Sequence, residues 1–187
     1  MGQDENRRKE AVTPPVLISQ LTPIDVAEYR RVRLRALEDH PEAFRSSRDE
    51  EAARPVSWWE ERLAPRQVSG CSFFGAWTPA RDLVGTAGLV FDARSKTLHT
   101  AKLVGMYVVP EHVGRGVAAQ LLAACIAFAR ADPLLEILYL TVTSTNAGAI
   151  RLYARAGFRS YGCEPSSMKI GQRSFDNLMM SLALRPE

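Results

Sequence analysis

Short apolar runs recur along this chain, and about seven of them have the length and the β-branched or aromatic content of β-strands. They cover residues 16–21, 71–77, 83–91, 102–109, 134–143, 158–169 and 174–184. The turn-like segment 78–82 separates the second run from the third, and only a few residues separate the last two. Both pairs are therefore predicted to form β-hairpins.

Apolar residues at three-to-four spacing predict helices between these strands. The first helix runs from about residue 25 to the break at His40 and Pro41, on the apolar positions Val26, Tyr29, Val32, Leu34 and Leu37. A second, shorter helix is predicted over about 56–63. It lies in a charged, weakly periodic stretch, residues 41–65, whose aromatic residues are Phe44, Trp58 and Trp59.

Two further helices carry clear boundary signals. One begins after a glycine turn and is stopped by Asp132 and Pro133, with an apolar side formed by Val117, Leu121, Cys125 and Phe128 or Ala129. The other runs from Asn146 to Ala156, because asparagine suits the start of a helix and Gly157 suits its exit.

The resulting order, β-α-α-β-β-β-α-β-α-β-β, predicts an α/β (α+β) fold with a mixed, largely antiparallel central sheet of about seven strands. Helices are expected on both faces of this sheet. Residues 15–187 are predicted to form a single domain. Residues 1–14 are polar and charged, so we expect a disordered N-terminal tail.

Composition narrows the function classes. The 187 residues carry a formal charge of only +3 with no basic block, so nucleic acid is not an expected partner. No window approaches the run of about 18 apolar residues that a membrane span needs, and we expect a cytoplasmic protein that does not engage membranes. The three cysteines form no C-x-x-C pair, so free buried thiols are expected and no metal site is predicted.

The sequence VGRGVA, residues 113–118, joins the fourth predicted strand to the long helix. Such a junction offers free backbone N–H groups at the positive end of a helix dipole, which suits a phosphate. The pattern is neither G-x-G-x-x-G nor a nucleotide-triphosphate loop. A connection that needs glycine only for its turn explains the same residues equally well.

Asn146 and Tyr153 lie seven residues apart on the last predicted helix. They therefore face nearly the same side, with a rise between them of roughly 10 Å, and one extended ligand could touch both. The alternatives are an ordinary helix cap for Asn146 and a core position for Tyr153.

PEHVGRGVAAQLL followed by TSTNAGAIRLYARAGF resembles the paired signature of the GNAT superfamily of acetyl-CoA-dependent N-acetyltransferases. The resemblance implies a GNAT-like fold, transfer of an acetyl group from acetyl-CoA to a primary amine, and no metal. It implies that Met106, Tyr107 and Val108 pair their main chain with the pantetheine arm and orient the acetyl group. It further implies a pyrophosphate cradle built from the backbone amides of Gly114, Arg115, Gly116, Val117, Ala118 and Ala119.

The same resemblance implies that Asn146 contacts the cofactor arm and that Tyr153 stands near the sulfur. A phenol with a reference pKa near 10 can protonate a thiolate whose conjugate acid has a pKa near 8.5, so Tyr153 is the expected general acid. Direct transfer of this kind requires no nucleophilic cysteine.

Two positions depart from the family pattern. Val113 stands where the loop usually has Gln or Arg, and Thr141 stands where many members carry a glutamate base. The remaining candidates for the base are His99, Glu111, Glu164 or a water chain, and the sequence does not rank them.

The acceptor is expected in the region between the first two helices. Its acidic residues Asp49, Glu50, Glu51 and Glu60 favour a cationic amine, with Phe44 and Trp58 packing the apolar part. Solvated helix charges and core aromatics are an equal alternative. The acceptor is a small molecule or a peptide, and the protein is a monomer or a homodimer. A non-catalytic CoA-binding or regulatory module is the alternative from another functional class.

Overall fold

The computed structural model describes residues 16–185, so the predicted tail at 1–14 lies outside the described residues. The strands are β1 Leu17–Gln20, β2 Cys71–Trp77, β3 Leu83–Phe91, β4 Thr100–Val108, β5 Ile137–Thr143, β6 Arg159–Ile170 and β7 Arg173–Ala183. The helices are α1 Val26–Asp39, α2 Arg48–Ala52, α3 Val56–Leu63, α4 Arg66–Ser69, α5 Val117–Ala131 and α6 Ala147–Arg155. Short 3-10 turns cover Pro23–Asp25, Pro41–Ala43 and Pro110–His112.

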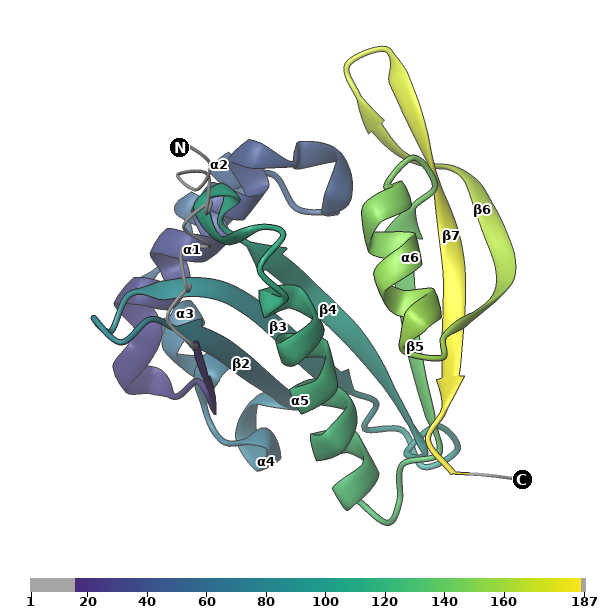
Figure 1. Ribbon diagram of the computed structural model, residues 1–187, viewed down its shortest axis with the longest axis horizontal. Coiled ribbons are helices and arrows are strands. Elements are labelled where there is room, and N and C mark those ends of the chain that lie inside the picture. The colour runs from purple at the N-terminus through teal and green to yellow at the C-terminus, as the bar shows by residue number, and fades with distance from the viewer. Residues whose placement is uncertain (1–15, 186–187) are drawn as a thin grey trace, which may run out of the picture.

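The strands form one seven-stranded sheet in the order β1-β2-β3-β4-β5-β7-β6 (Figure 1). Every neighbouring pair is antiparallel except β4 and β5, which are parallel. That parallel pair is short, because Thr100–Lys102 alone pair with Ile137–Tyr139 before the two strands diverge. The sheet is therefore split along most of the length of β4 and β5.

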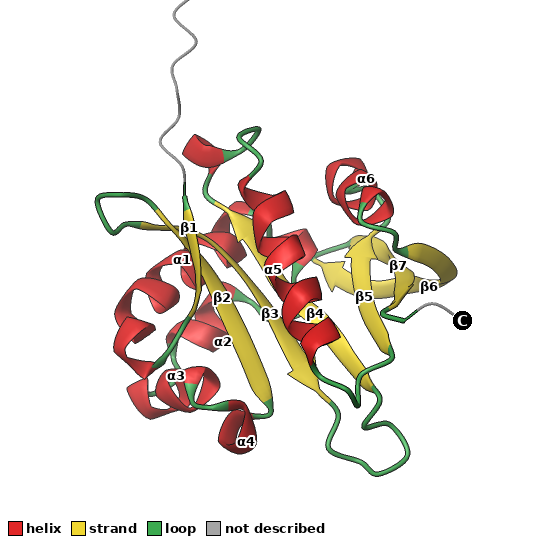
Figure 2. Ribbon diagram, turned by 60° about the horizontal axis from the view of Figure 1, so that its bottom comes forward, coloured by secondary structure: helices red, strands yellow, loops and turns green. Residues whose placement is uncertain are grey.

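Helices cover both faces of the sheet, and two adjacent residues of β2 show this directly. Successive strand residues point to opposite faces. The Phe73 ring lies 5.2 Å from that of Tyr29 in α1, whereas the Phe74 ring lies 5.3 Å from that of Phe128 in α5. Figure 2 shows α5 on one side of the strands and α1 to α4 on the other. The predicted mixed sheet of seven strands with helices on both faces is confirmed.

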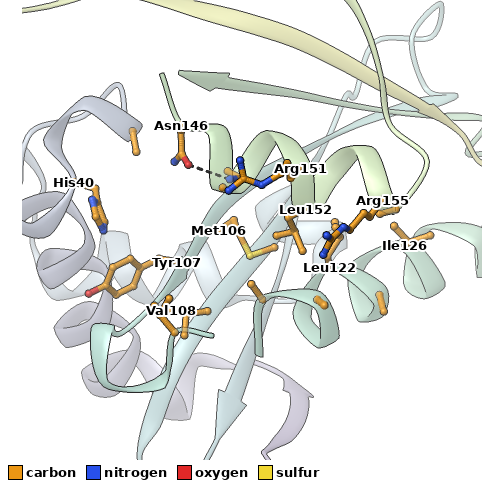
Figure 3. Close-up of a pocket in the computed structure, with 18 of the residues that line it drawn as sticks. His40, Met106, Tyr107, Val108, Leu122, Ile126, Asn146, Arg151, Leu152 and Arg155 are labelled. Atoms are coloured by element: carbon orange, nitrogen blue, oxygen red, sulfur yellow. Dashed lines mark hydrogen bonds between the residues drawn. The ribbon is translucent and has the colours of Figure 1, made fainter. Parts of the chain in front are cut away.

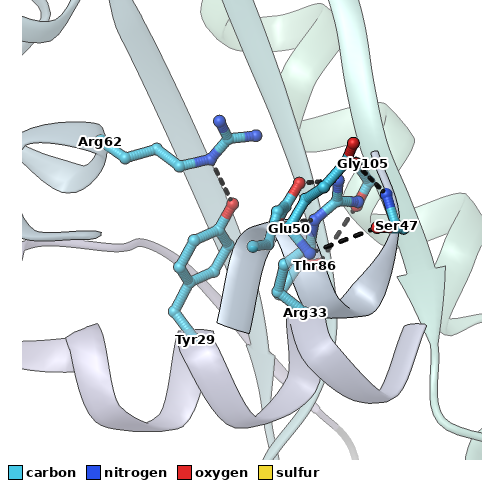
Figure 4. Close-up of polar contacts among 8 residues, drawn as sticks. Tyr29, Arg33, Ser47, Glu50, Arg62, Thr86 and Gly105 are labelled. Atoms are coloured by element: carbon cyan, nitrogen blue, oxygen red, sulfur yellow. Dashed lines mark hydrogen bonds and ion pairs between the residues drawn. The ribbon is translucent and has the colours of Figure 1, made fainter. Parts of the chain in front are cut away.

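Two short helices, α2 and α4, were not predicted from apolar periodicity. Helix α2 begins with a capping box: the Ser47 hydroxyl accepts from the Glu50 amide at 3.2 Å, and the Glu50 carboxylate accepts from the Ser47 amide at 2.7 Å (Figure 4). These reciprocal bonds satisfy two backbone donors of the first turn. A helix of five residues is too short to display a hydrophobic stripe, so only its cap was visible in the sequence.

Two further expectations need correction. The predicted strand at 134–143 begins only at Ile137, because Asp132 holds the preceding residues in a turn by accepting from the Leu134 amide at 2.9 Å. The three thiols are free, but they are not all buried: Cys125 is buried, Cys71 is half-buried and Cys163 is exposed.

A buried ion pair joins α1 to α2. The Arg33 guanidinium donates to both carboxylate oxygens of Glu51, at 2.9 and 2.6 Å, and these side chains are only 8% and 6% exposed. Burial alone would raise the pKa of Glu51, but the bonds and charge of Arg33 hold it below its ordinary value. Arg33 also stacks on the ring of Phe44 at 4.5 Å, so the pair fixes the chain that follows α1.

Between residues 16 and 185, no helix is long and apolar enough to cross a membrane. The same residues contain no cluster of three or more His, Cys, Asp or Glu side chains that would hold a metal ion.

Candidate functional site

A cavity of about 930 Å³ occupies the region where β4 separates from β5 (Figure 3). Its walls come from α5 and α6, whose apolar side chains Leu122, Ile126 and Leu152 face it. The residues at the end of β4, Met106, Tyr107 and Val108, also line it. The cavity therefore brings together three predicted site residues of β4 and the two helices that the sequence motifs mark.

On the edge of β4 that faces the cavity, backbone N–H and C=O groups are not paired with another of the described strands. On its other side, Tyr107 and Val108 pair with Thr86 and Gly85 of β3. On the cavity side, the pairing with β5 ends at Lys102. A β-bulge falls nearby, where Gly105 has a φ of +65°, a conformation that favours glycine. The main chain of Met106–Val108 is thus an open strand edge inside a cleft, where an extended ligand can pair with it.

The glycine turn before α5 presents a row of unused donors. Gly114 and Gly116 have φ values of +79° and +76°, which explains the need for glycine at both positions. The first helical bond of α5 runs from the Gln120 amide to the Gly116 carbonyl at 3.1 Å. In the described part of the chain, the amides of residues 114 to 119 have no acceptor, and a Cβ atom added at either glycine would meet nothing within 4 Å. The loop thus presents a row of backbone N–H groups with open space beside both glycines, which suits an anion.

Residues on both sides of this loop belong to the cavity wall. Val113 precedes the glycines and lines the cavity, as do Ala118 and Ala119 in the first turn of α5. Val117 points into the core and is 2% exposed, so its amide, not its side chain, is the group available to a ligand. The six residues predicted for the pyrophosphate therefore lie at the rim of the cavity.

Asn146 is the N-cap of α6 and also lines the cavity. Its side-chain oxygen accepts from the Ala149 amide at 3.0 Å. The amide NH₂ group of the same side chain remains for a ligand. The two interpretations of Asn146 from the sequence, helix cap and ligand contact, are thus compatible.

Tyr153 lies on the buried side of α6 and is not among the residues that line the cavity. It is 6% exposed, and its ring packs edge-on against Phe158 at 5.9 Å. Burial, and next the nearby Cys125 thiol, raise the pKa of its phenol. The hydroxyl therefore stays protonated at neutral pH, but it is a weaker proton donor than a solvated phenol.

Three arginines, Arg130, Arg151 and Arg155, give the cavity a cationic margin. None has an acidic partner within 4 Å in the range 16–185. The sequence did not indicate these arginines as site residues. They come to face the same cavity only because α5 and α6 pack opposite each other.

His40 is a second group that the sequence did not reveal. It is the C-cap of α1 and lines the cavity with Ala43 and Phe44, and its ring stands edge-on to that of Tyr107 at 6.2 Å. The Tyr107 hydroxyl donates to Asp39. Burial, and next the bond to Asp39, raise the pKa of Tyr107. The sequence showed His40 only as part of a helix break.

The base candidates from the sequence do not reach the cavity. His99 precedes β4, at the opposite end of that strand from Met106–Val108. Glu111 accepts from Arg35 at 2.7 Å, and this bond lowers its pKa. Glu164 accepts from Arg45 at 2.7 Å. Thr141, in the place of the usual glutamate, is exposed.

The acceptor region also differs from the expectation. The acidic residues Asp49, Glu50, Glu51 and Glu60 are absent from the cavity wall, and Glu51 is engaged by Arg33. Phe44 does line the cavity. Trp58 instead lines a separate hollow of about 330 Å³ with Arg62 and Cys71. The sequence shows which residues of this region are acidic and which are aromatic. It does not show which side of the fold each of them faces, because that depends on how α2 and α3 pack.

Comparisons with known proteins agree with this arrangement. A model of the acetyltransferase (GNAT) family matches residues 33–158. A GNAT-family acetyltransferase from Streptococcus pneumoniae shares 22% identity with a TM-score of 0.81, over 90% of this chain and 98% of that one. A Salmonella typhimurium protein solved with its cofactor acetyl-CoA shares 22% identity with a TM-score of 0.74, over 92% and 95% of the two chains. A phosphinothricin acetyltransferase from Sinorhizobium meliloti, in complex with acetyl-CoA, shares 14% identity with a TM-score of 0.75, over 90% and 88%.

Proposed function

Because this chain belongs to the acetyltransferase (GNAT) family, whose model matches more than half of it, we propose that it moves an acetyl group from acetyl-CoA directly to a primary amine. The observation that carries this proposal is the cavity between α5 and α6. It joins a row of unpaired backbone amides at residues 114–119 to an open strand edge at Met106–Val108. An elongated ligand with a phosphate group and an amide-containing arm matches both features.

The residues present fit acetyl-CoA as the cosubstrate. The amides of Gly114 to Ala119 hold its pyrophosphate, helped by the positive end of the α5 dipole. The main chain of Met106–Val108 pairs with the pantetheine arm, and the free NH₂ group of Asn146 donates to it. The arginines at the cavity margin complement the remaining negative charge of the ligand.

Acetyl-CoA supplies an activated acetyl thioester, and the chain supplies orientation and charge stabilisation. A backbone N–H at the end of β4 stabilises the oxyanion that develops when the amine attacks the carbonyl. Tyr153 delivers its proton to the departing thiolate. This last role is supported by the position of Tyr153 on α6, two helical turns after Asn146.

The acceptor in this proposal is a small-molecule amine or a peptide amine. Its end of the cavity is lined by His40, Ala43, Phe44 and Tyr107, without a carboxylate. Such a lining favours an amine on an apolar body over a polyamine with several positive charges. The cytoplasmic location and the monomeric or homodimeric state stay predictions.

One alternative function has a specific observation in its favour. Thr141 replaces the usual glutamate, and Tyr153 does not line the cavity. A CoA-binding or regulatory module without catalysis would have the same fold and the same cradle. Turnover, not binding, separates the two functions.

Two measurements on the purified full-length chain test the proposal. Isothermal titration with acetyl-CoA should show binding to one site per chain, and dephospho-CoA should bind more weakly if arginines contact the terminal phosphate. Release of free thiol from acetyl-CoA, across a panel of aromatic and aliphatic monoamines, peptides and spermidine, should identify an acceptor. Absence of binding contradicts the cosubstrate assignment, whereas binding without thiol release supports the regulatory alternative.

A further inference from the structure

The segment from His40 to Phe44 closes one end of the cavity, and Figure 3 shows His40 and Tyr107 there, away from Ile126 and Arg155. Met106–Val108, where the acetyl group is placed in the proposed function, adjoins this end. The amine must approach the thioester from the side that the cosubstrate leaves open. His40 is therefore positioned to meet the acceptor nitrogen.

The backbone around His40 is held by bonds to two other elements. The His40 amide donates to the Ala36 carbonyl at 3.1 Å and its carbonyl accepts from the Ala43 amide at 2.9 Å. The Thr143 hydroxyl, at the end of β5, donates to the Glu42 carbonyl at 2.6 Å. Phe44 is fixed by the Arg33 guanidinium, which Glu51 holds in turn. These bonds fix the position of the His40 backbone relative to the split between β4 and β5.

The two nitrogens of the imidazole have different surroundings. Its Nδ1 atom lies 3.7 Å from a carboxylate oxygen of Glu42. Its Nε2 atom has no hydrogen-bond partner among residues 16–185. The side chain is 53% exposed, so the ring is in contact with solvent as well as with the cavity. A carboxylate at ion-pair distance from one imidazole nitrogen, with the other nitrogen open to accept a proton, is an arrangement that suits a general base.

The other titratable groups that line the cavity do not accept a proton near neutral pH. Arg130, Arg151 and Arg155 stay charged. Tyr107 is protonated, and its hydroxyl is committed to Asp39. Behind it, Asp39 lies 3.4 Å from Arg35, and Arg35 also binds Glu111. Among these groups and Glu42, His40 is the one that lines the cavity and can accept a proton.

We propose that His40 is the general base of the transfer and that Glu42 is its positioning residue. This inference rests on the proposed acetyl transfer. His40 Nε2 takes one proton from the acceptor ammonium and later releases it to solvent. The neutral amine then forms the amide C–N bond while the C–S bond of the thioester breaks. The second proton leaves the nitrogen, and the thiolate is protonated to give the free thiol.

The test uses the panel amine that gives the highest rate of thiol release. His40→Gln removes the base while keeping a polar side chain of similar reach, and His99→Gln, at the far end of β4, is the matched control. We expect His40→Gln to lower kcat/KM for the amine about 100-fold at neutral pH and to leave the acetyl-CoA dissociation constant unchanged. The rise of wild-type kcat/KM with pH across the imidazole range should disappear in His40→Gln and persist in His99→Gln.

Glu42→Gln gives a readout that a structural role alone would not change. Removing the carboxylate should lower kcat/KM for the amine severalfold in the wild-type background and cause no further loss in the His40→Gln background, because Glu42 acts through His40. An unchanged pH profile in His40→Gln, with an active wild type, overturns the base assignment while leaving the acetyl transfer intact. Weakened acetyl-CoA binding in His40→Gln also overturns it, because the residue then acts on the cosubstrate. Absence of thiol release in the wild type contradicts the transfer reaction and the role of His40 together.

Discussion

The two ends of the cavity are built from different parts of the chain. The end that we propose for the cosubstrate, here the cosubstrate end, consists mainly of backbone, with open amides at residues 114–119 and the unpaired edge of β4. The acceptor end consists of side chains, with His40 and Phe44 held by Glu42, Arg33 and Thr143. A binding site made of backbone groups requires only a particular local backbone conformation, and short glycine-containing motifs specify such a conformation. Side-chain sites need contacts between distant elements, which such motifs do not describe.

The largest effect is expected at the acceptor end. Glu51→Ala leaves the Arg33 guanidinium buried without its partner, which costs about 3–5 kcal/mol of unfolding free energy. Urea denaturation measures this loss, and Asp49→Asn, on the same helix but 97% exposed, is the control with little effect. A loss similar to that of Asp49→Asn would show that the ion pair does not support this wall.

The same pair predicts a pH dependence. The pKa of Glu51 is lowered from its ordinary value of 4.5 in the folded state. Its stabilising contribution is therefore fully present above pH 4.5 and is lost as the pH falls through the lowered value. Unfolding free energy measured against pH should decline less steeply below that point in Glu51→Gln than in the wild type. If the unfolding free energies of the wild type and Glu51→Gln change with pH in the same way, the lowered pKa of Glu51 is contradicted.

At the cosubstrate end, Gly116→Asp should weaken acetyl-CoA binding at least about 1000-fold, or about 4 kcal/mol. The substitution puts a negative side chain beside the amides proposed to hold the pyrophosphate, at a φ of +76°. Gly171→Asp is the matched control, since Gly171 has a φ of +58° in the turn between β6 and β7 and is equally open. It carries a comparable backbone cost but should bind acetyl-CoA normally. Normal binding by Gly116→Asp in isothermal titration would contradict the position of the cradle.

Tyr153→Phe tests the proposed general acid on the buried side of α6. We expect kcat to fall about 100-fold, as is typical for loss of a general acid, with little change in the acetyl-CoA dissociation constant. Tyr139→Phe is the control, because Tyr139 stacks on the exposed Tyr161 and not on α6. A Tyr153→Phe enzyme with wild-type kcat would remove Tyr153 as the acid and leave water to protonate the thiolate.

The smallest effects separate the two roles of Asn146. Asn146→Ala should lose about 1 kcal/mol of stability, because the cap on the Ala149 amide disappears. Asn146→Asp keeps an oxygen for the cap but removes the NH₂ donor. It should therefore retain stability in thermal unfolding while weakening acetyl-CoA binding severalfold. Equal binding by Asn146→Asp and the wild type would restrict this residue to the cap.

The fold was largely predictable from the sequence because strands and long helices leave local patterns. Periodic apolar residues located α1, α5 and every strand, with an error of a few residues where Asp132 forms a turn. The strand order depends on pairing between distant segments. The split between β4 and β5 depends on it too, and no local pattern encodes either of them.

The site was predictable to a smaller extent. The motif residues on β4, the glycine loop and Asn146 do gather around one cavity or its rim. Their binding roles stay predictions. His40 was missed because a single histidine at a helix end carries no spacing signal. Glu51 was interpreted as an acid facing a cationic acceptor or as a solvated helix charge, because its partner, Arg33, lies on another helix and the pair forms only when α1 packs against α2.

The short join between β4 and β5 has a mechanical consequence. Only three residue pairs hold the two halves of the sheet together along this seam, at the end remote from the acetyl position. In the proposed binding mode, a cosubstrate arm bonded to β4 fills part of the gap and adds contacts between the two halves of the sheet. At a ligand concentration of 100 times the dissociation constant, the folded state gains about 2.7 kcal/mol. Amide hydrogen exchange in β5 and α6 should therefore slow when acetyl-CoA binds.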